Sequence, residues 1–315
     1  MKVLLHYRAS AGFQAALARG AAAVGVEAVT VDETDIAGFG REVADAEVVL
    51  HVLRPFTATM LAAGPRLKLV QKLGVGVGTI DLEACKAAGV AVANMPGANS
   101  QAVAEMTLGL MLAVLRRLCY LDALTRRGEG WSPDLELIDG TGEIAGRTVG
   151  FVGYGSSASR LGPALEALGA RVIYTARSAK PNLCGRFVNL RTLLEEADLV
   201  SLHTPLTSET HRLINAETLA AMKPGAILIN TARGGLVDEP ALLAALESGR
   251  LRGAGLDVFT QEPVDPANPL LTLPTVVVSS HQSWLTAETI DRCLAAAFDN
   301  CRRLAAGEPL NNRIV

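Results

Sequence analysis

Three separated segments of the sequence carry side chains suited to hydride transfer to or from a carbonyl carbon. They contain Arg233, Glu262 and His281. We expect Arg233 to bind a substrate carboxylate and polarise the carbonyl, His281 to protonate the carbonyl oxygen, and Glu262 to hold the imidazolium. Each residue taken singly also fits a structural role at a turn, a surface or a strand end. The residue types alone therefore leave both interpretations open.

The three residues follow predicted strands, and the whole chain alternates short apolar runs with helical patterns. Such alternation is typical of parallel sheets with crossover helices. Ligands of these sheets bind beyond the carboxyl ends of the strands, where all three residues fall. The expected strands are Val3–His6, Ala28–Val31, Val48–Val52, Leu69–Lys72, Val90–Asn94, Thr148–Val152, Arg171–Thr175, Leu199–His203, Ala226–Asn230, Gly253–Val258 and Val276–Ser279.

A long helical pattern over Gln101–Leu121 separates two alternating series of strands and helices. With 315 residues available, this division predicts two α/β domains, each a doubly wound parallel sheet. The last helical segment, Ala287–Ala306, is long enough to return to the first domain.

A glycine-rich turn after Thr148–Val152 matches the G-x-G-x-x-A pattern of dinucleotide-binding loops. Gly153 permits the tight turn and Gly155 lets the backbone approach a pyrophosphate, while Ala158 allows close packing of helix on strand. Ser156 and Ser157 then open a helix whose free N–H groups face the phosphates. The alternative is an ordinary glycine-rich turn between a strand and a helix.

The end of the next strand predicts the choice of nicotinamide cofactor. An NAD site usually has an acidic residue there to bind the ribose hydroxyls, but this chain has Thr175. Arg177 and Ser178 are positioned to bind a 2′-phosphate, and Lys180 adds positive charge. We therefore expect NADP(H) to be preferred and NAD(H) to be possible, the alternative being a solvated loop.

Composition excludes several classes of partner. A net charge of −3, from 29 basic and 32 acidic residues, gives no footprint for nucleic acid or for a membrane surface. The apolar runs Met1–Leu5 and Thr107–Leu115 are too short for a signal peptide and a membrane span. Five cysteines without a CxxC pair indicate a reducing cytoplasm, and five histidines without ligand spacing predict no metal.

Several motifs in order make the sequence resemble the D-isomer-specific 2-hydroxyacid dehydrogenase family over nearly its whole length. This family includes glyoxylate/hydroxypyruvate reductases, D-lactate dehydrogenases and 3-phosphoglycerate dehydrogenases. Several motifs in the same order are far more specific than any one. The motifs that carry the resemblance are Leu73–Leu82, Asn94–Glu105, Leu202–Thr210, Asn230–Glu239 and Gly253–Pro263.

The resemblance implies a fold and an assembly. A flavodoxin-like substrate domain is expected from residues 1–98 and 285–315, with an NADP-binding Rossmann domain at 99–284 inserted between them. Members of the family are usually homodimers built through the cofactor domain, largely by the helix near Gln101–Leu121.

The resemblance also implies roles for individual residues. It gives Arg233, Glu262 and His281 the roles argued above, and it places substrate carboxylate binding at the backbone N–H groups of Val75 and Gly76. Asp257 matches the position that holds the nicotinamide carboxamide. The remaining positions expected to contact the cofactor are His203, Thr204, Pro205, Thr231, Ala232 and His281.

Three departures from the family pattern bear on the substrate. Ser280 stands where a proline usually precedes the catalytic histidine, and Val77-Gly78 replaces an aromatic and acidic pair. Gln282-Ser283-Trp284 replaces a small, glycine-containing segment, and Trp284 either lines the substrate pocket or packs in the core. Arg54 falls where phosphoglycerate dehydrogenases carry a substrate-contacting arginine, and it either binds a second anionic group or solvates a loop.

The sequence thus predicts an NADP(H)-dependent oxidoreductase that interconverts a small 2-oxo acid and a D-2-hydroxy acid, of the glyoxylate/hydroxypyruvate reductase type. One alternative is a nucleotide-sensing protein related to the corepressors of the family. Another is a phosphite dehydrogenase, because those enzymes can keep the arginine, glutamate and histidine. The intact set of Arg233, Glu262 and His281 favours an enzyme over a sensor.

Overall fold

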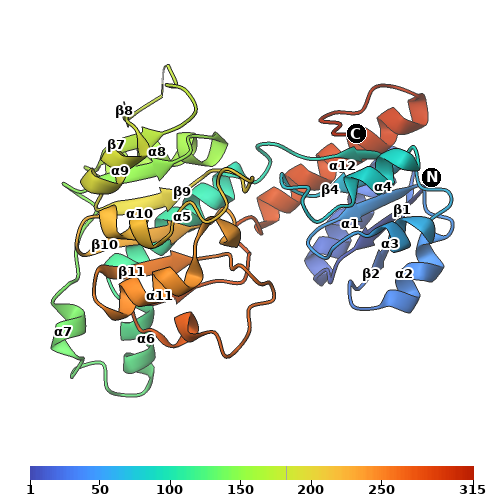
Figure 1. Cartoon of the computed structure of the whole chain (residues 1–315). Coiled ribbons are helices and arrows are strands. Elements are labelled where there is room, and N and C mark those ends of the chain that lie inside the picture. The colour runs from blue at the N-terminus through green and yellow to red at the C-terminus, as the bar shows by residue number, and fades with distance from the viewer. Residues whose placement is uncertain (182) are drawn as a thin grey trace. The chain divides into compact units, whose positions relative to one another are not determined.

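The computed structural model describes residues 1–181 and 183–315, which form two compact units (Figure 1). The first unit is discontinuous and contains Met1–Asn99 and Leu285–Val315, while the second contains Ser100–Trp284. Each unit is an α/β structure built on one parallel sheet, as the alternation of strand and helix patterns predicts.

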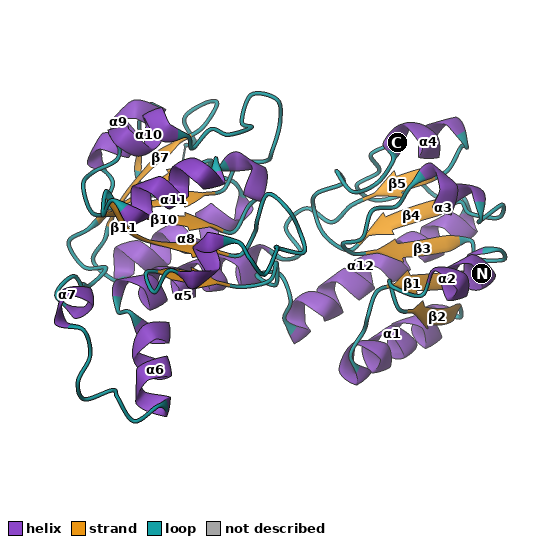
Figure 2. Ribbon diagram, turned by 60° about the horizontal axis from the view of Figure 1, so that its bottom comes forward, coloured by secondary structure: helices purple, strands orange, loops and turns teal. Residues whose placement is uncertain are grey.

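The first unit has five parallel strands in the order β2-β1-β3-β4-β5, which is the flavodoxin-like order. Helices α2, α3 and α4 contribute to a core that contains Leu4, Val49 and Val70 from the strands, and α1 packs against α12 (Figure 2). The elements of this unit are β1 Lys2–His6, α1 Ala11–Val24, β2 Glu27–Val31, α2 Ile36–Val43, β3 Val48–His51, α3 Ala58–Ala62, β4 Leu69–Lys72, α4 Leu82–Ala87, β5 Ala91–Ala93 and α12 Ala287–Ala306.

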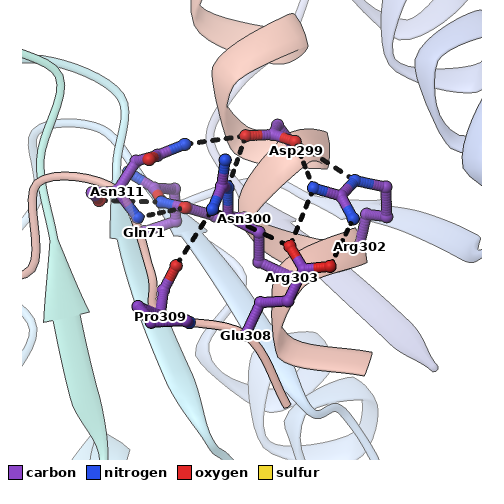
Figure 3. Close-up of polar contacts among 8 residues, drawn as sticks. All are labelled: Gln71, Asp299, Asn300, Arg302, Arg303, Glu308, Pro309 and Asn311. Carbon is purple, nitrogen blue, oxygen red and sulfur yellow. Dashed lines mark hydrogen bonds and ion pairs between the residues drawn. The ribbon is translucent and has the colours of Figure 1, made fainter. Parts of the chain in front are cut away.

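Hydrogen bonds fasten the returning C-terminal segment to the sheet of the first unit (Figure 3). The amide of Asn300 on α12 donates to Gln71 Oε1 on β4 at 2.6 Å and to the carbonyl oxygen of Asn311 at 3.1 Å. The Asn311 N–H donates back to Asn300 Oδ1 at 2.8 Å. Asp299 accepts from Arg303 and from the Asn311 amide, so the end of α12 and the chain after it are held together.

The second unit has seven parallel strands in the order β12-β11-β10-β9-β6-β7-β8. The chain starts near the middle of the sheet at β6 and extends in both directions, which makes the edge beyond β6 a topological switch point. Its strands are β6 Thr148–Val152, β7 Arg171–Thr175, β8 Arg186–Phe187, β9 Leu199–Leu202, β10 Ala226–Asn230, β11 Leu251–Leu256 and β12 Val276–Val278. Its helices are α5 Ser100–Leu115, α6 Leu118–Arg126, α7 Leu135–Ile138, α8 Ser156–Ala167, α9 Leu190–Glu196, α10 Ala216–Ala221, η1 Gly234–Leu236, α11 Glu239–Glu247 and η2 Pro269–Thr272.

The single long helix expected over Gln101–Leu121 is wrong, because the chain forms two helices that break at Arg117. This residue adopts a left-handed conformation with φ 52° and is 7% exposed. Its guanidinium donates to the carbonyl oxygens of Leu137 at 3.2 Å and Arg252 at 3.1 Å. These bonds draw the side chain into the unit, and α6 starts afresh at Leu118.

Two further features complete the description of the fold. Strand β8 has only two residues, Arg186 and Phe187, both exposed, and the sequence pattern did not predict it. Among the described residues, no helix combines the length and the apolar character needed to cross a membrane.

Candidate active site

The three candidate catalytic side chains follow three neighbouring strands of the second unit. Arg233 comes after β10, Glu262 after β11 and His281 after β12, and these strands pair β10 to β11 and β11 to β12 in parallel. Because the carboxyl ends of parallel strands meet at one edge, the topology brings the three segments together.

Glu262 and His281 form a direct pair. The distance from His281 Nδ1 to Glu262 Oε2 is 2.6 Å, and the other carboxylate oxygen accepts the Phe259 N–H at 3.0 Å. Burial by itself raises the pKa of Glu262, but the hydrogen bonds from His281 and Phe259 outweigh it and hold this pKa below its usual value. Glu262 is therefore ionised at neutral pH and held in one orientation.

Arg233 lies beside this pair, on a turn that its neighbours hold in place. The Asn230 amide donates to the Arg233 carbonyl at 2.9 Å, and the Ala232 N–H donates to Asn230 Oδ1 at 3.0 Å. Burial lowers the pKa of the Arg233 guanidinium, and the charge of Glu262 acts in the opposite direction. The arginine stays charged and half-buried, which strengthens its attraction for an anion.

Gly234 lets the arginine turn pack against the segment that carries Glu262. A Cβ atom on Gly234 would lie 1.9 Å from the carbonyl carbon of Phe259 and 2.0 Å from its oxygen. Only glycine fits this approach, because the obstructing atoms belong to the backbone. The close contact fixes the spacing between Arg233 and Glu262.

Asp257, which the resemblance places at the nicotinamide carboxamide, makes several hydrogen bonds within the protein. Its side chain is fully buried. Oδ1 accepts from Ser279 Oγ at 2.5 Å and from the Gln282 N–H at 2.9 Å, and Oδ2 accepts from the Ser283 N–H at 3.0 Å. The His281 N–H donates to the Asp257 carbonyl at 2.7 Å. In this structure Asp257 holds the segment that carries His281.

These contacts place His281 in an unusual backbone conformation. Its φ is 57°, in the left-handed region that residues other than glycine seldom adopt. Strain of this kind persists only where the surroundings impose it, and Asp257 supplies the bonds that do so. Within the described part of the chain, Nε2 of His281 has no hydrogen-bond partner, so this nitrogen is available to a substrate oxygen.

The glycine-rich loop after β6 has room for a pyrophosphate. Gly153 has φ 91°, and a Cβ atom there would lie 2.7 Å from backbone atoms of His203. A Cβ atom on Gly155 would meet open space instead, and the N-terminus of α8 carries no side-chain cap. Ala158 is fully buried where α8 packs on the sheet. The loop therefore fits the phosphates of a dinucleotide, with uncapped N–H groups facing them.

The residues expected to bind the ribose and its 2′-phosphate lie at the end of β7 and in the turn that follows. Thr175 is half-buried, and Arg177 and Ser178 are exposed. The Lys180 N–H donates to the Tyr174 hydroxyl at 2.8 Å, which folds the following loop back onto the strand. Arg177 and Ser178 thus lie on a turn, open to solvent and with no acidic residue among them.

The other expected cofactor contacts vary in exposure. Thr204 and Ala232 are half-buried and Pro205 is exposed. Thr231 is buried, and its Oγ1 lies 2.9 Å from Thr107 Oγ1 on α5, so this hydroxyl is already partnered. Trp284, at the end of the second unit, is 7% exposed, so most of its surface is packed against protein.

The first unit carries the expected substrate residues at the carboxyl edge of its own sheet. Val75 and Gly76 follow β4, and the Asn94 amide donates to the Val75 carbonyl at 2.8 Å. Within the described residues the N–H groups of Val75 and Gly76 bind no protein acceptor. Arg54 is exposed, and its guanidinium donates to the Glu33 carbonyl.

Sequence reasoning missed the residues that hold this site in shape. Asn230 and Phe259 fix the arginine and the glutamate, and Ser201 contacts His203. These are local contacts, between residues two or three positions apart, and residue type alone does not say which backbone or side-chain group each one binds. Among the described residues, no group of three or more His, Cys, Asp or Glu side chains is arranged to hold a metal ion.

Comparisons with known proteins agree with this geometry. A family model described as D-isomer specific 2-hydroxyacid dehydrogenase, NAD binding domain, matches residues 108–283. A glyoxylate reductase of Aeropyrum pernix is 39% identical over 259 residues, covering 79% of this chain and 76% of that protein. A D-3-phosphoglycerate dehydrogenase of Mycobacterium leprae is 42% identical over 255 residues, covering 80% of this chain but only 47% of that longer protein. The apo-structure of D-lactate dehydrogenase from Escherichia coli has a TM-score of 0.90 at 27% identity and covers 100% of both chains.

Proposed function

Since the chain belongs to the D-isomer specific 2-hydroxyacid dehydrogenase family, we propose that it is an NADP(H)-dependent reductase of small 2-oxo acids. The observation that carries this proposal is the 2.6 Å contact of Glu262 with His281, beside a charged Arg233 and on the same sheet as a dinucleotide loop. A bound nicotinamide would supply or accept the hydride at this site.

Side chains of this protein would stabilise the charge that develops on the carbonyl oxygen and would supply the proton that this oxygen takes up. As hydride reaches the carbonyl carbon, negative charge grows on oxygen, and the Arg233 guanidinium stabilises it. His281 then protonates that oxygen through Nε2. Glu262, bonded to Nδ1, favours the charged imidazolium and keeps the ring aligned. In the oxidative direction His281 accepts the proton.

Binding would be divided between the two units. We assign the dinucleotide to the second unit, at Gly153, Gly155 and the start of α8, which fits the matched NAD-binding family model. We assign the carbonyl and carboxylate of the substrate to Arg233 in the second unit. In the first unit, the N–H groups of Val75 and Gly76 bind no protein acceptor among the described residues and are suited to an anion. Preference for NADP(H) follows from Thr175 in place of an acidic residue and from the exposed pair Arg177 and Ser178.

Glyoxylate and hydroxypyruvate are the substrates we favour, because relatives named glyoxylate reductase match most of this chain. The test is the loss of NADPH absorbance with glyoxylate, hydroxypyruvate and phenylpyruvate, repeated with NADH. Reduction of none of them by a protein that binds dinucleotide would favour the sensor function instead. Reduction of NADP⁺ by phosphite would identify the phosphite-oxidising alternative.

We also propose a homodimer formed through the second unit. Large apolar side chains are exposed on α6, α7 and the loop between them, namely Leu118 at 59%, Trp131 at 89% and Leu135 at 75%. Exposed groups of this kind are typical of protein interfaces. Sedimentation should give twice the mass of 33.0 kDa. Burial of Trp131 in the dimer should blue-shift its emission relative to a dissociated variant such as Leu118→Glu.

A further inference from the structure

Ser157, His203 and Ser201 form a hydrogen-bonded line that ends at the N-terminus of α8. Ser157 Oγ lies 3.2 Å from His203 Nδ1, and Ser201 Oγ lies 2.9 Å from His203 Nε2. Ser157 is the second residue of α8, beside the glycine loop, while Ser201 is fully buried in β9. The line therefore runs from the interior of the sheet to the edge assigned to the dinucleotide.

The surroundings of His203 keep its ring neutral and fixed. Burial lowers the pKa of His203 to about 4, so the imidazole carries one proton at neutral pH. The Phe151 ring meets it edge-on, with ring centroids 5.1 Å apart. A neutral imidazole donates from one nitrogen and accepts at the other, so the two serines must have opposite roles.

Ser201 decides which nitrogen carries the proton. Within the described residues its hydroxyl has one partner, His203 Nε2. If Nε2 donated to Ser201, the buried Ser201 proton would have no acceptor. Leaving a buried donor unpaired is costly, whereas a spare lone pair is tolerated more often. Ser201 therefore donates to Nε2, and Nδ1–H donates to Ser157 Oγ.

This arrangement leaves the Ser157 hydroxyl proton without a partner among the described residues. We propose that Ser201 and His203 act as positioning residues that orient the Ser157 hydroxyl as a donor to the pyrophosphate of the bound dinucleotide. The inference rests on the proposed cofactor site and deepens it. It adds a side-chain donor to the backbone N–H groups of α8, set by a relay that begins inside the sheet.

Calorimetric titration of the full-length protein with NADP⁺, ADP-ribose and 2′-AMP tests the proposal. A hydrogen bond to a charged group is strong enough that Ser157→Ala should lower the affinity for NADP⁺ and for ADP-ribose about 10-fold. Binding of 2′-AMP should be unchanged, because this ligand has no pyrophosphate. Ser159→Ala is the matched control, since Ser159 lies on α8 but its hydroxyl bonds to the Ser156 carbonyl at 3.0 Å.

A double-mutant cycle separates positioning from a merely structural role. Ser201→Ala should lower the affinity for ADP-ribose a few-fold in the wild-type background. It should have no further effect on this affinity in Ser157→Ala. Additive effects would overturn the relay. Unchanged affinity in Ser157→Ala would overturn the whole inference while leaving the cofactor site intact. A wild-type protein that binds none of the three ligands would instead refute the proposed function.

Nitrogen-15 spectra of the wild-type protein give a second readout that needs no folded variant of Ser201. His203 should show a protonated Nδ1 and a bare Nε2, with its signals assigned by their loss in His203→Gln. The opposite tautomer would overturn the proposal, because Ser157 would then donate to the imidazole and present only lone pairs to the phosphate.

Discussion

Both units carry polar side chains at the carboxyl edge of a doubly wound parallel sheet, but these side chains differ in burial and in their partners. At the carboxyl edge of the second unit, His281 and Glu262 are in direct contact, with side chains 22% and 35% exposed. At the carboxyl edge of the first unit, His6 and His51 end β1 and β3 and are 3% and 1% exposed. Similar residue types thus occur in equivalent positions of two doubly wound sheets.

Burial separates the two sets of histidines. Burial lowers the pKa of His6 to about 4, helped by the nearby charge of Arg54. Burial together with the charge of Lys72 lowers the pKa of His51 to about 3. The His6 ring packs on Phe39 with centroids 4.6 Å apart. Both imidazoles are therefore neutral at physiological pH, and His51 Nε2–H donates to the Arg54 carbonyl at 2.6 Å.

We infer from this difference that a histidine at a strand end needs both a carboxylate partner and access to a substrate in order to serve as an acid–base group. The second unit supplies Glu262 as the partner and leaves His281 Nε2 open. The first unit supplies burial and the positive charges of Arg54 and Lys72, both of which disfavour a charged imidazole, and it presents backbone N–H groups at Val75 and Gly76. We therefore expect chemistry from the second unit and substrate binding from the first.

The largest expected effect comes from His281→Ala. Loss of the proton donor should lower kcat/KM for 2-oxo acid reduction by about 10²–10⁴-fold, the usual range for a general acid. The matched variant is His51→Gln in the first unit, which should lower stability but cost much less in turnover by the folded protein. Steady-state kinetics with thermal unfolding curves compare the two. Equal losses of kcat/KM would remove the distinction between the units.

Arg233→Lys should lower kcat/KM by roughly 10²-fold. Lysine keeps the charge but lacks the planar fork that binds a carboxylate with two parallel hydrogen bonds. The comparison variant is Arg54→Lys in the first unit, where the exposed guanidinium donates to a backbone carbonyl. Its effect should be smaller. Wild-type kinetics in folded Arg233→Lys would return the arginine to a structural role.

The double change Thr175→Asp with Arg177→Ala should shift cofactor preference towards NADH by about 10–100-fold in the ratio of kcat/KM values. The new carboxylate repels a 2′-phosphate and accepts the ribose hydroxyls, while the missing guanidinium no longer binds that phosphate. Initial rates measured over a series of NADPH or NADH concentrations, at one fixed substrate concentration, give the ratio. Equal use of both cofactors by the wild type would contradict the proposed preference.

Mild acid should destabilise the first unit more than the second. His6 and His51 have folded pKa values of about 4 and 3, below the unfolded value of 6.5, so the unfolded state binds more protons as the pH falls below 6.5. Each histidine should lower the free energy of unfolding by about 2 kcal/mol between pH 7 and pH 5. The second unit has one such residue, His203, with a pKa of about 4.

Hydrogen exchange at pH 7 and pH 5 resolves the two units. Amides of β1 and β3 should lose more protection than amides of β6 and β9. His6→Gln should reduce the pH dependence of the first unit without changing that of the second. A uniform loss of protection across both sheets would show that the buried histidines do not determine acid stability.

The sequence predicted the two parallel sheets well, and the structure confirms them. Val48–His51 and Thr148–Val152 are mostly apolar runs buried on both faces, so their pattern is continuous and easily recognised. The break at Arg117 escaped prediction, because it depends on bonds to carbonyls at Leu137 and Arg252, far away in the sequence.

The candidate site also has a part that the sequence predicted and a part that it did not. Motifs identified the strand ends that carry Arg233 and His281, because residue type and spacing are local. The buried role of Asp257 and the contact between Ser157 and His203 were not predictable, because they arise where loops from different strands meet. Local patterns thus nominate reactive residues, while the bonds that orient them appear only in three dimensions.

The central claim is that Glu262 makes His281 a proton donor, and the pH dependence of kcat/KM in Glu262→Gln tests it most directly. The lowered pKa of Glu262 keeps it ionised across the neutral range, where it favours the protonated imidazolium. Reduction should therefore be full at lower pH and decline as pH rises, while oxidation of the hydroxy acid should increase. Glu262→Gln keeps the shape but removes the charge, so the midpoint of the decline should move to lower pH. The same midpoint in both proteins would show that Glu262 is not coupled to the proton donor and would contradict the account.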